Sequence, residues 1–211
     1  MKQINPALGA ALVAAALLAA CHKTGSNAGA DVSNPANSAP VNAAQDAAGG
    51  VVGMASGVAN PTTAAAFVPA ATIANMYEIQ AAQIAAQRGH ASEVKDFARM
   101  IIQDHTKIGQ QMQKTLASAG ANVQPPADLD DRRKGMIENL KAAGDTDFDL
   151  AYLHQQLAAH IEALELMDRY ASGGDNAALK ALAAQTKPVI QKHLDEVKRI
   201  GGEKLTGKAG G

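Results

Sequence analysis

Three histidines lie in the otherwise apolar seams of three different predicted helices: His105, His160 and His193. In each stretch the apolar residues recur every three or four positions, which is the spacing of one face of an α-helix, and the histidine occupies one of these positions. A polar ring on a core-facing stripe must be hydrogen-bonded there or bind a ligand. The three histidines are therefore the main chemical signal of this sequence.

One carboxylate is expected at the same height as the histidines. At a rise of about 1.5 Å per residue, each histidine lies about 20–25 Å from the turn of its helical hairpin, and Glu78 lies about 16 Å from the first turn. Three imidazoles and the Glu78 carboxylate could bind a single Fe, Zn, Mn or Cu ion. Asp104, Asp149 and Tyr152 are available to orient the imidazoles from behind.

The same layer has a second interpretation that needs no metal. The histidines could hydrogen-bond to one another, to Glu78 and to Tyr152 within the core. Such a buried network is tolerated when its polar groups are satisfied. The sequence leaves both interpretations open.

Composition and periodicity predict an all-α domain that would carry these residues. The chain is 47% hydrophobic but only 3% aromatic, and it is rich in alanine, the best helix former. Helical periodicity begins near Pro69 and continues to about Ile200, and no strand-like alternation of useful length occurs. We expect the domain to span residues 67–201.

Turn signals divide this domain into four main helices and one short helix. Glycines at Gly89 and Gly173 predict two antiparallel hairpins. The connection between the hairpins is too long for a tight turn and contains an amphipathic stretch of its own. These features predict a ferritin-like four-helix bundle whose crossover connection carries a short extra helix; an up-down-up-down bundle with an added fifth helix is the alternative. The expected segments are residues 70–88, 92–118, 127–144, 145–173 and 175–201.

The beginning of the chain indicates a lipoprotein. Residues 1–20 contain Lys2 followed by an apolar run that is typical of a secretory signal and short for a membrane span. The sequence LAAC that ends at Cys21 resembles the bacterial lipobox, which implies cleavage before Cys21 and acylation of that residue. His22 in place of Asp implies the outer membrane, by resemblance to the sorting rule of enteric bacteria.

The segments that flank the domain are expected to be flexible. Residues 21–66 are rich in Ala, Asn, Gly, Ser and Pro and hold almost no large apolar residue. Such a segment cannot bury enough surface to offset its ordering entropy, so it reads as a tether between lipid and domain. Residues 202–211 form the expected C-terminal tail. The lipid anchor would hold the domain at the membrane, facing the periplasm.

Charge and motif content exclude several functions. With 19 basic and 20 acidic residues, the chain lacks the basic footprint of a nucleic-acid-binding protein. It has no phosphate-cradling glycine loop and no recognisable serine or cysteine nucleophile. The charged run Asp130–Lys134 is expected to form a solvated helix face.

Four stretches of the domain resemble a known family: IANMYEIQAAQIA, VKDFARMIIQDHTK, GDTDFDLAYLHQQLAAH and VIQKHLDEVKRI. Together they are similar to the domain of unknown function 4142 (DUF4142) family of bacterial envelope proteins. The resemblance implies a branch of the ferritin-like fold, secreted or anchored to the outer membrane, with no established activity.

The wider ferritin-like group implies a di-iron site, which this sequence does not match. That site uses a Glu on each of two helices and Glu-x-x-His on the other two. The residues three positions before the histidines are Ile102, Leu157 and Ile190, none of which binds metal. A mononuclear site, or a site lost and repacked, fits better than an oxidase or an iron store.

Two functions follow from the sequence. The first is a non-enzymatic, lipid-anchored envelope protein with a structural or stress-related role and protein partners, which an exposed apolar patch would support. The second is a metal-binding protein or metalloenzyme that uses the histidine layer. The incomplete catalytic equipment favours the first.

Overall fold

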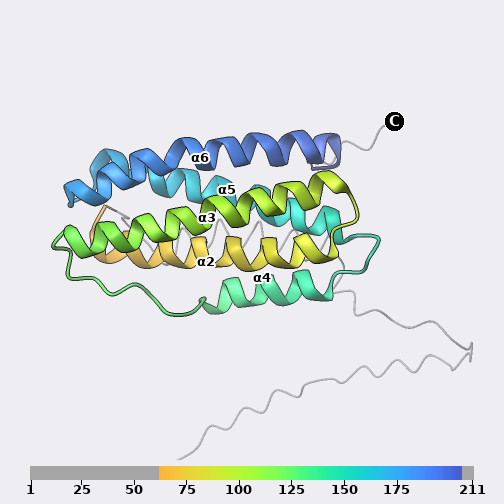
Figure 1. Ribbon diagram of the computed structural model, residues 1–211, viewed down its shortest axis with the longest axis horizontal. Coiled ribbons are helices and arrows are strands. Elements are labelled where there is room, and N and C mark those ends of the chain that lie inside the picture. Colours follow the sequence, from red (N-terminus) through yellow and green to blue (C-terminus); the bar gives the residue numbers. More distant parts are fainter. Residues whose placement is uncertain (1–61, 206–211) are drawn as a thin grey trace, which may run out of the picture. The chain divides into compact units, whose positions relative to one another are not determined.

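The computed structural model describes residues 62–205, which form an all-helical domain (Figure 1). The expected all-α class is confirmed, and no strand occurs in this range. The signal peptide, Cys21, most of the expected tether and residues 206–211 lie outside the described residues. None of the described helices is both long and apolar enough to cross a membrane. The elements are α2 (Ala64–Arg88), α3 (Ser92–Ser118), α4 (Asp131–Ala142), α5 (Phe148–Gly173), α6 (Ala177–Gly201) and the 3₁₀ helix η2 (Gly202–Leu205).

The four long helices pair through two hairpins and two further contacts. Helix α2 packs against α3 and α5, and α6 packs against α5 and α3. The short helix α4 lies along α2 and α5, and Figure 1 shows it on the side of α2 away from α6. Between α3 and α5 the chain returns along the length of the domain, so that α5 begins beside the start of α3. The backbone N–H of His90, just before α3, donates to the side chain of Asp149, in the first turn of α5, at 2.9 Å.

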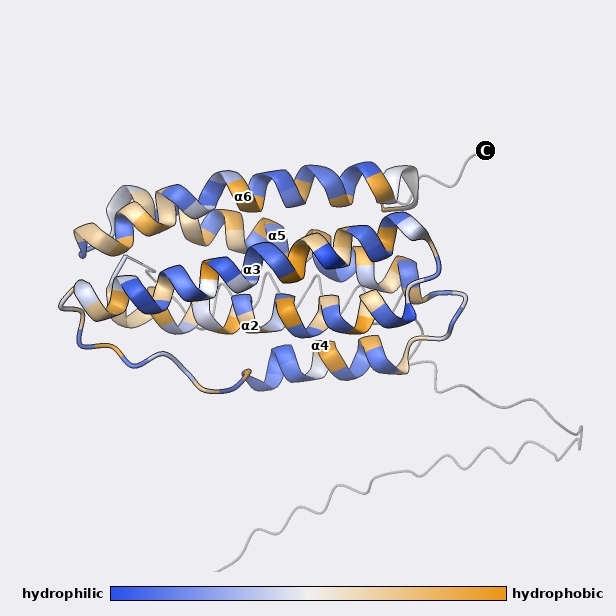
Figure 2. Ribbon diagram, viewed as in Figure 1, coloured by the Kyte–Doolittle hydropathy of each residue, from blue (hydrophilic) through white to orange (hydrophobic). Residues whose placement is uncertain are grey.

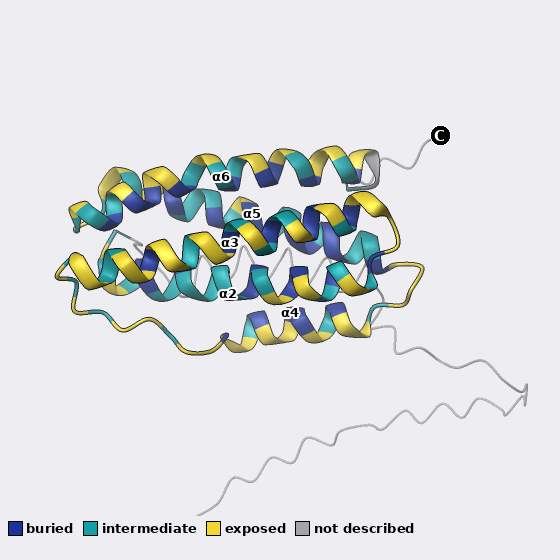
Figure 3. Cartoon of the chain, viewed as in Figure 1, coloured by how far each residue is buried: buried dark blue, intermediate teal, exposed yellow. Residues whose placement is uncertain are grey.

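Amphipathic patterning explains why these helices pack together. In Figure 2, α3 and α6 alternate between hydrophobic and hydrophilic residues along their length, and in Figure 3 their buried residues recur at turn spacing. Such a stripe is the face that a helix turns toward its neighbours. Most of the buried apolar side chains form one cluster around Tyr77, Phe97 and Tyr152, and a smaller cluster surrounds Phe67 and Tyr170.

The first helix begins earlier than the sequence suggested. We expected residue 70 as its start because helical periodicity begins near Pro69, but α2 begins at Ala64 with Thr63 as its N-cap, and Pro69 lies inside it. The added turn packs Phe67 into the smaller apolar cluster, where its ring stacks on Tyr170 with centroids 3.9 Å apart. This burial outweighs the backbone hydrogen bond that proline removes.

The other helix boundaries lie close to their expected positions. Helix α3 covers the expected residues 92–118, and Asn176 caps α6 through bonds from two backbone N–H groups. Helix α5 begins at Phe148, three residues after the expected residue 145. Helix α4 covers Asp131–Ala142 and is shorter at both ends than the expected segment 127–144.

Candidate metal centre

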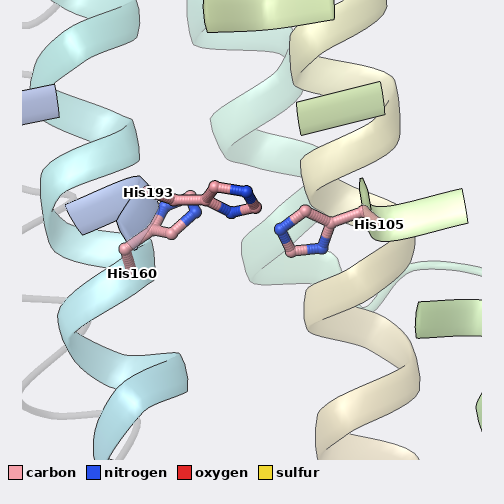
Figure 4. A group of neighbouring side chains, drawn as sticks. All are labelled: His105, His160 and His193. Carbon is pink, nitrogen blue, oxygen red and sulfur yellow. The ribbon is translucent and has the colours of Figure 1, made fainter. Parts of the chain in front are cut away.

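The three seam histidines come together in the interior of the domain. Figure 4 shows their imidazoles turned toward one another from α3, α5 and α6. One ring nitrogen from each lies within 4.8 Å of the others, and the ring centroids are 5.4 to 5.8 Å apart. Their exposed fractions are 3% for His105, 0% for His160 and 0% for His193. We call this group the histidine triad.

Each ring of the triad has one nitrogen next to a protein acceptor. Nδ1 of His105 lies 3.1 Å from the Asn75 amide oxygen, and Nδ1 of His160 lies 2.9 Å from a backbone carbonyl oxygen of its own helix. Nε2 of His193 lies 3.1 Å from the carboxylate of Asp104. Because all three partners are acceptors, these are the nitrogens that carry hydrogen, and the rings are held in defined orientations.

The second nitrogen of each ring has no hydrogen-bond partner. These atoms are Nε2 of His105, Nε2 of His160 and Nδ1 of His193, all buried. Leaving a buried polar atom unpaired costs about 1–3 kcal/mol, so each of these nitrogens requires a partner that the protein's own side chains and backbone do not supply. A lone pair on each of three converging imidazoles is the donor set of a metal ion.

The spacing of the triad fits a metal ion after a small contraction. A point equidistant from three atoms that are all within 4.8 Å of one another lies at most about 2.8 Å from each, whereas zinc–imidazole bonds measure about 2.0–2.1 Å. Each ring would therefore move inward by at most roughly 0.7 Å, which side-chain rotation can supply. The residues present thus fit a single mononuclear ion.

Burial keeps two of the rings ready to act as ligands. It lowers the pKa of His105 well below its ordinary value, and the neighbouring His160 and His193 lower it further. Burial also lowers the pKa of His193 to about 4, although Asp104 partly opposes the shift. At neutral pH these two rings are uncharged, which is the form that binds metal.

Glu78, an expected metal ligand, lies behind the triad. Its Oε1 is 3.8 Å from Nδ1 of His160, on the side of the ring that faces away from the unpaired nitrogen. Its Oε2 accepts a 2.7 Å hydrogen bond from the side chain of Gln156. Burial raises the pKa of Glu78, while His160 and Gln156 lower it in part. From this position the carboxylate supports His160 rather than joining the three nitrogens.

The three residues expected to orient the imidazoles are dispersed. Asp104 does contact the triad, but through His193 on α6 rather than through its neighbour in sequence. Asp149 lies about 16 Å along α5 from the triad, where it accepts the backbone N–H groups of residues 90 and 91 at the start of α3. Tyr152 is buried two turns from His160, and its hydroxyl has no partner. Burial and the negative charge of Glu78 raise the pKa of Tyr152 well above its usual range.

Sequence reasoning missed two groups of residues near the site. Asn75 and Gln156 hold the triad and Glu78, and neutral amides on a helix gave no signal of that role. The run Asp130–Lys134, expected to be a solvated face, contains Arg133 with a side chain only 5% exposed. Arg132 and Arg133 both pair with Glu162, at 2.8 and 2.7 Å.

Most of the chain matches the model of one protein family. The Domain of unknown function (DUF4142) matches residues 51–200, well over half of the chain, so the chain belongs to this family. No curated protein and no solved structure matches the chain. The family has no known function, and the function must therefore be argued from the site itself.

Proposed function

We propose that this protein binds one transition-metal ion through His105, His160 and His193. The observation that carries the proposal is the pattern of partners: in each ring the outer nitrogen faces a protein acceptor and the inner nitrogen faces none. Metal-bound histidines have this arrangement, because the outer hydrogen bond fixes the tautomer and leaves the inner lone pair for the ion.

The donor set narrows the range of metals. Imidazole suits zinc, copper, iron and nickel, whereas magnesium, calcium and manganese prefer carboxylate and water. The close donors are three imidazoles, so zinc, copper and iron fit better than manganese. A bound zinc ion would supply Lewis acidity, and copper or iron would supply electron exchange. The chain itself contributes the ring orientations and a core that excludes water.

The proposed scaffold is a ferritin-like four-helix bundle of α2, α3, α5 and α6, with α4 in the crossover. Its support is the pairing of two hairpins and the return of the chain along the length of the domain between them. In such bundles, metal sites lie in the core and are built from side chains on facing helices. The absence of Glu-x-x-His at these three histidines argues against a di-iron centre.

A role limited to docking protein partners has less support. A contiguous exposed apolar patch of several hundred Å² marks many partner-binding surfaces. Within residues 62–205, Ile161 is the single large apolar side chain classed as exposed, at 42%. An isolated residue of this kind is ordinary on a protein surface. We therefore place metal binding ahead of partner docking.

The proposed location is the periplasmic face of the bacterial outer membrane. The support for this location is the apolar leader, the lipobox-like sequence at Cys21 and His22 in the position after it. Metabolic labelling with a clickable fatty acid tests the anchor, because a Cys21→Ala variant would lose the label. Labelling of that variant at the parent level would refute lipidation at this residue.

Elemental analysis tests the metal site. The purified protein, kept free of chelators and tags, is incubated separately with Fe, Zn, Mn and Cu and desalted. The parent should retain near-stoichiometric metal, and His160→Gln should lose it. His154→Gln is the matched control, because this ring lies on the same helix but outside the triad, and it should bind like the parent. An empty parent, or a fully loaded His160→Gln variant, would refute the proposal.

A further inference from the structure

The three acceptors behind the triad differ in charge and exposure. The carbonyl oxygen of Gln156 is buried, and the side chain of Asn75 is uncharged. Asp104 is the charged member, and its side chain keeps 20% exposure whereas that of His193 keeps 0%. Asp104 is therefore a direct link between the buried triad and solvent.

A groove lies over the helix seam that the Asp104–His193 pair bridges. It is lined by Met100 on α3 and, on α6, by residues that include two acidic side chains, Asp195 and Glu196, and two basic ones, Lys192 and Arg199. Met100 lies four residues before Asp104, and Glu196 lies three residues after His193, so each is one helical turn from the pair. The groove thus brings solvent within about one helical turn of the Asp104–His193 pair, and its two acidic side chains are balanced by two basic ones.

A lysine competes for the exposed carboxylate. The ammonium of Lys107 lies 3.5 Å from Oδ1 of Asp104, while Oδ2 faces His193. The Lys107 side chain is 58% exposed. A pair this exposed is weak, because water screens it. An arriving cation can therefore displace the lysine at little cost.

The other side of the triad is closed by packing and ion pairs. Helix α4 covers α2 and α5, the helices that carry Glu78 and His160. Arg132 and Arg133 tie α4 to Glu162 on α5. Because Glu162 accepts from both guanidinium groups, this side offers an approaching cation a paired cluster with an excess of one positive charge and no free carboxylate.

We propose that the metal ion reaches the triad through the seam between α3 and α6, with the Asp104 carboxylate as its first protein ligand. This inference rests on the proposed metal-binding function. The ion exchanges a bound water for an Asp104 oxygen and displaces Lys107 into solvent. It then passes to the three imidazoles, losing a further water for each nitrogen gained. Asp104 returns to its hydrogen bond with His193.

Stopped-flow absorption with Co²⁺ tests the route, since coordination by imidazole changes the visible spectrum of this ion. Asp104→Asn keeps an acceptor oxygen for His193 and removes the charge. We expect its association rate to fall at least about tenfold, the scale of electrostatic focusing, with a nearly unchanged dissociation rate. Lys107→Gln should associate several-fold faster than the parent. An Asp104→Asn variant that only dissociates faster would overturn the route and leave Asp104 a positioning residue.

Asp96→Asn is the matched control. Asp96 lies two turns before Asp104 on α3, pairs with Arg99 and has a 69% exposed side chain, so the variant makes the same charge change away from the seam. Its association rate should equal that of the parent, and an equal slowing in both variants would overturn a specific role for Asp104. Thermal unfolding followed by circular dichroism checks that each variant is folded. A parent that takes up no metal at all refutes the proposed function, whereas a parent that binds with unchanged rates in Asp104→Asn refutes the route alone.

Discussion

Two groups of polar side chains in the described domain differ in how completely they are paired. Every charged group of the first has a partner, and we call it the closed group; the second contains buried nitrogens without one, and we call it the open group. In the arginine cluster, formed by Arg132, Arg133 and Glu162, the carboxylate accepts from both guanidinium groups. The Arg133 guanidinium also lies over the Tyr77 ring, 4.6 Å from its centroid. In the histidine triad, by contrast, one nitrogen of every ring has no partner.

This difference separates a structural use of buried polarity from a functional one. In the arginine cluster, which joins α4 to α5, the chain supplies a partner for every charged group. Three unpaired nitrogens that converge on one point lower the stability of the folded state without joining anything. A protein retains such a feature when activity requires it, because function and stability often compete at a site. The comparison therefore favours a ligand for the triad.

Breaking the closed group should have the largest effect. Glu162→Ala leaves Arg133 buried and unpaired, and removing one partner of a buried ion pair costs about 3–5 kcal/mol. Because the Glu162 side chain is 15% exposed, we expect a loss of unfolding free energy at the lower end of this range. Urea unfolding of the metal-free protein measures the change in the free energy of unfolding.

Glu165→Ala is the control for this loss. Glu165 lies on the same helix and pairs with Arg169, but both side chains are largely exposed, at 42% and 56%. Exposed pairs of this kind contribute about 0–1 kcal/mol. Equal stabilities of the two variants would remove the distinction between the arginine cluster and an ordinary surface pair.

In the metal-free protein, the histidine triad should make the free energy of unfolding depend on pH, with an effect of intermediate size. His193 has a pKa of about 4 in the folded protein and about 6.5 in an unfolded chain. Between these values the unfolded state binds a proton that the folded state does not, so stability decreases as the pH falls. For this ring the loss is about 2 kcal/mol between about pH 7.5 and pH 5.

A variant isolates this ring from its titrating neighbours. His105, whose pKa burial also lowers, adds a decrease of the same sign, and Glu78, with its raised pKa, contributes the opposite slope. His193→Gln should therefore flatten the decrease relative to the parent. The test is to measure urea unfolding midpoints across this pH range. If the midpoints of His193→Gln and the parent fall in parallel as the pH decreases, His193 does not cause the decrease in stability.

The features that the sequence predicted are those that periodicity controls. Helix spacing places a histidine on the inner stripe of α3, α5 and α6 at one height, and the structure brings their rings together. Helix α2 starts six residues before the expected residue 70, because its added residues bury Phe67 and Val68 in the smaller apolar cluster.

The features that could not be predicted depend on the contacts between helices. Asp104 adjoins His105 in sequence but reaches His193, and only the packing of α3 on α6 decides that choice. A charged run such as Asp130–Lys134 is usually solvated, and Arg133 is buried because α4 lies over α2 and α5. Neutral amides such as Asn75 carry no sequence signal for their role behind an imidazole.

The smallest expected effect is also the most informative about the triad. His105→Leu replaces a ring that has an unpaired nitrogen with an apolar side chain, and Asn75 is not fully buried, so water can reach it. Removing an unsatisfied group in this way is nearly neutral or stabilising, so the metal-free variant should unfold within about 1 kcal/mol of the parent. Added zinc should then separate the two proteins. Free metal at 100 times its dissociation constant stabilises a one-site protein by about 2.7 kcal/mol, a gain that the variant should lack. A large loss in the metal-free state, together with no response of the parent to Zn, Cu or Fe, would instead make the histidine triad a structural network like the arginine cluster.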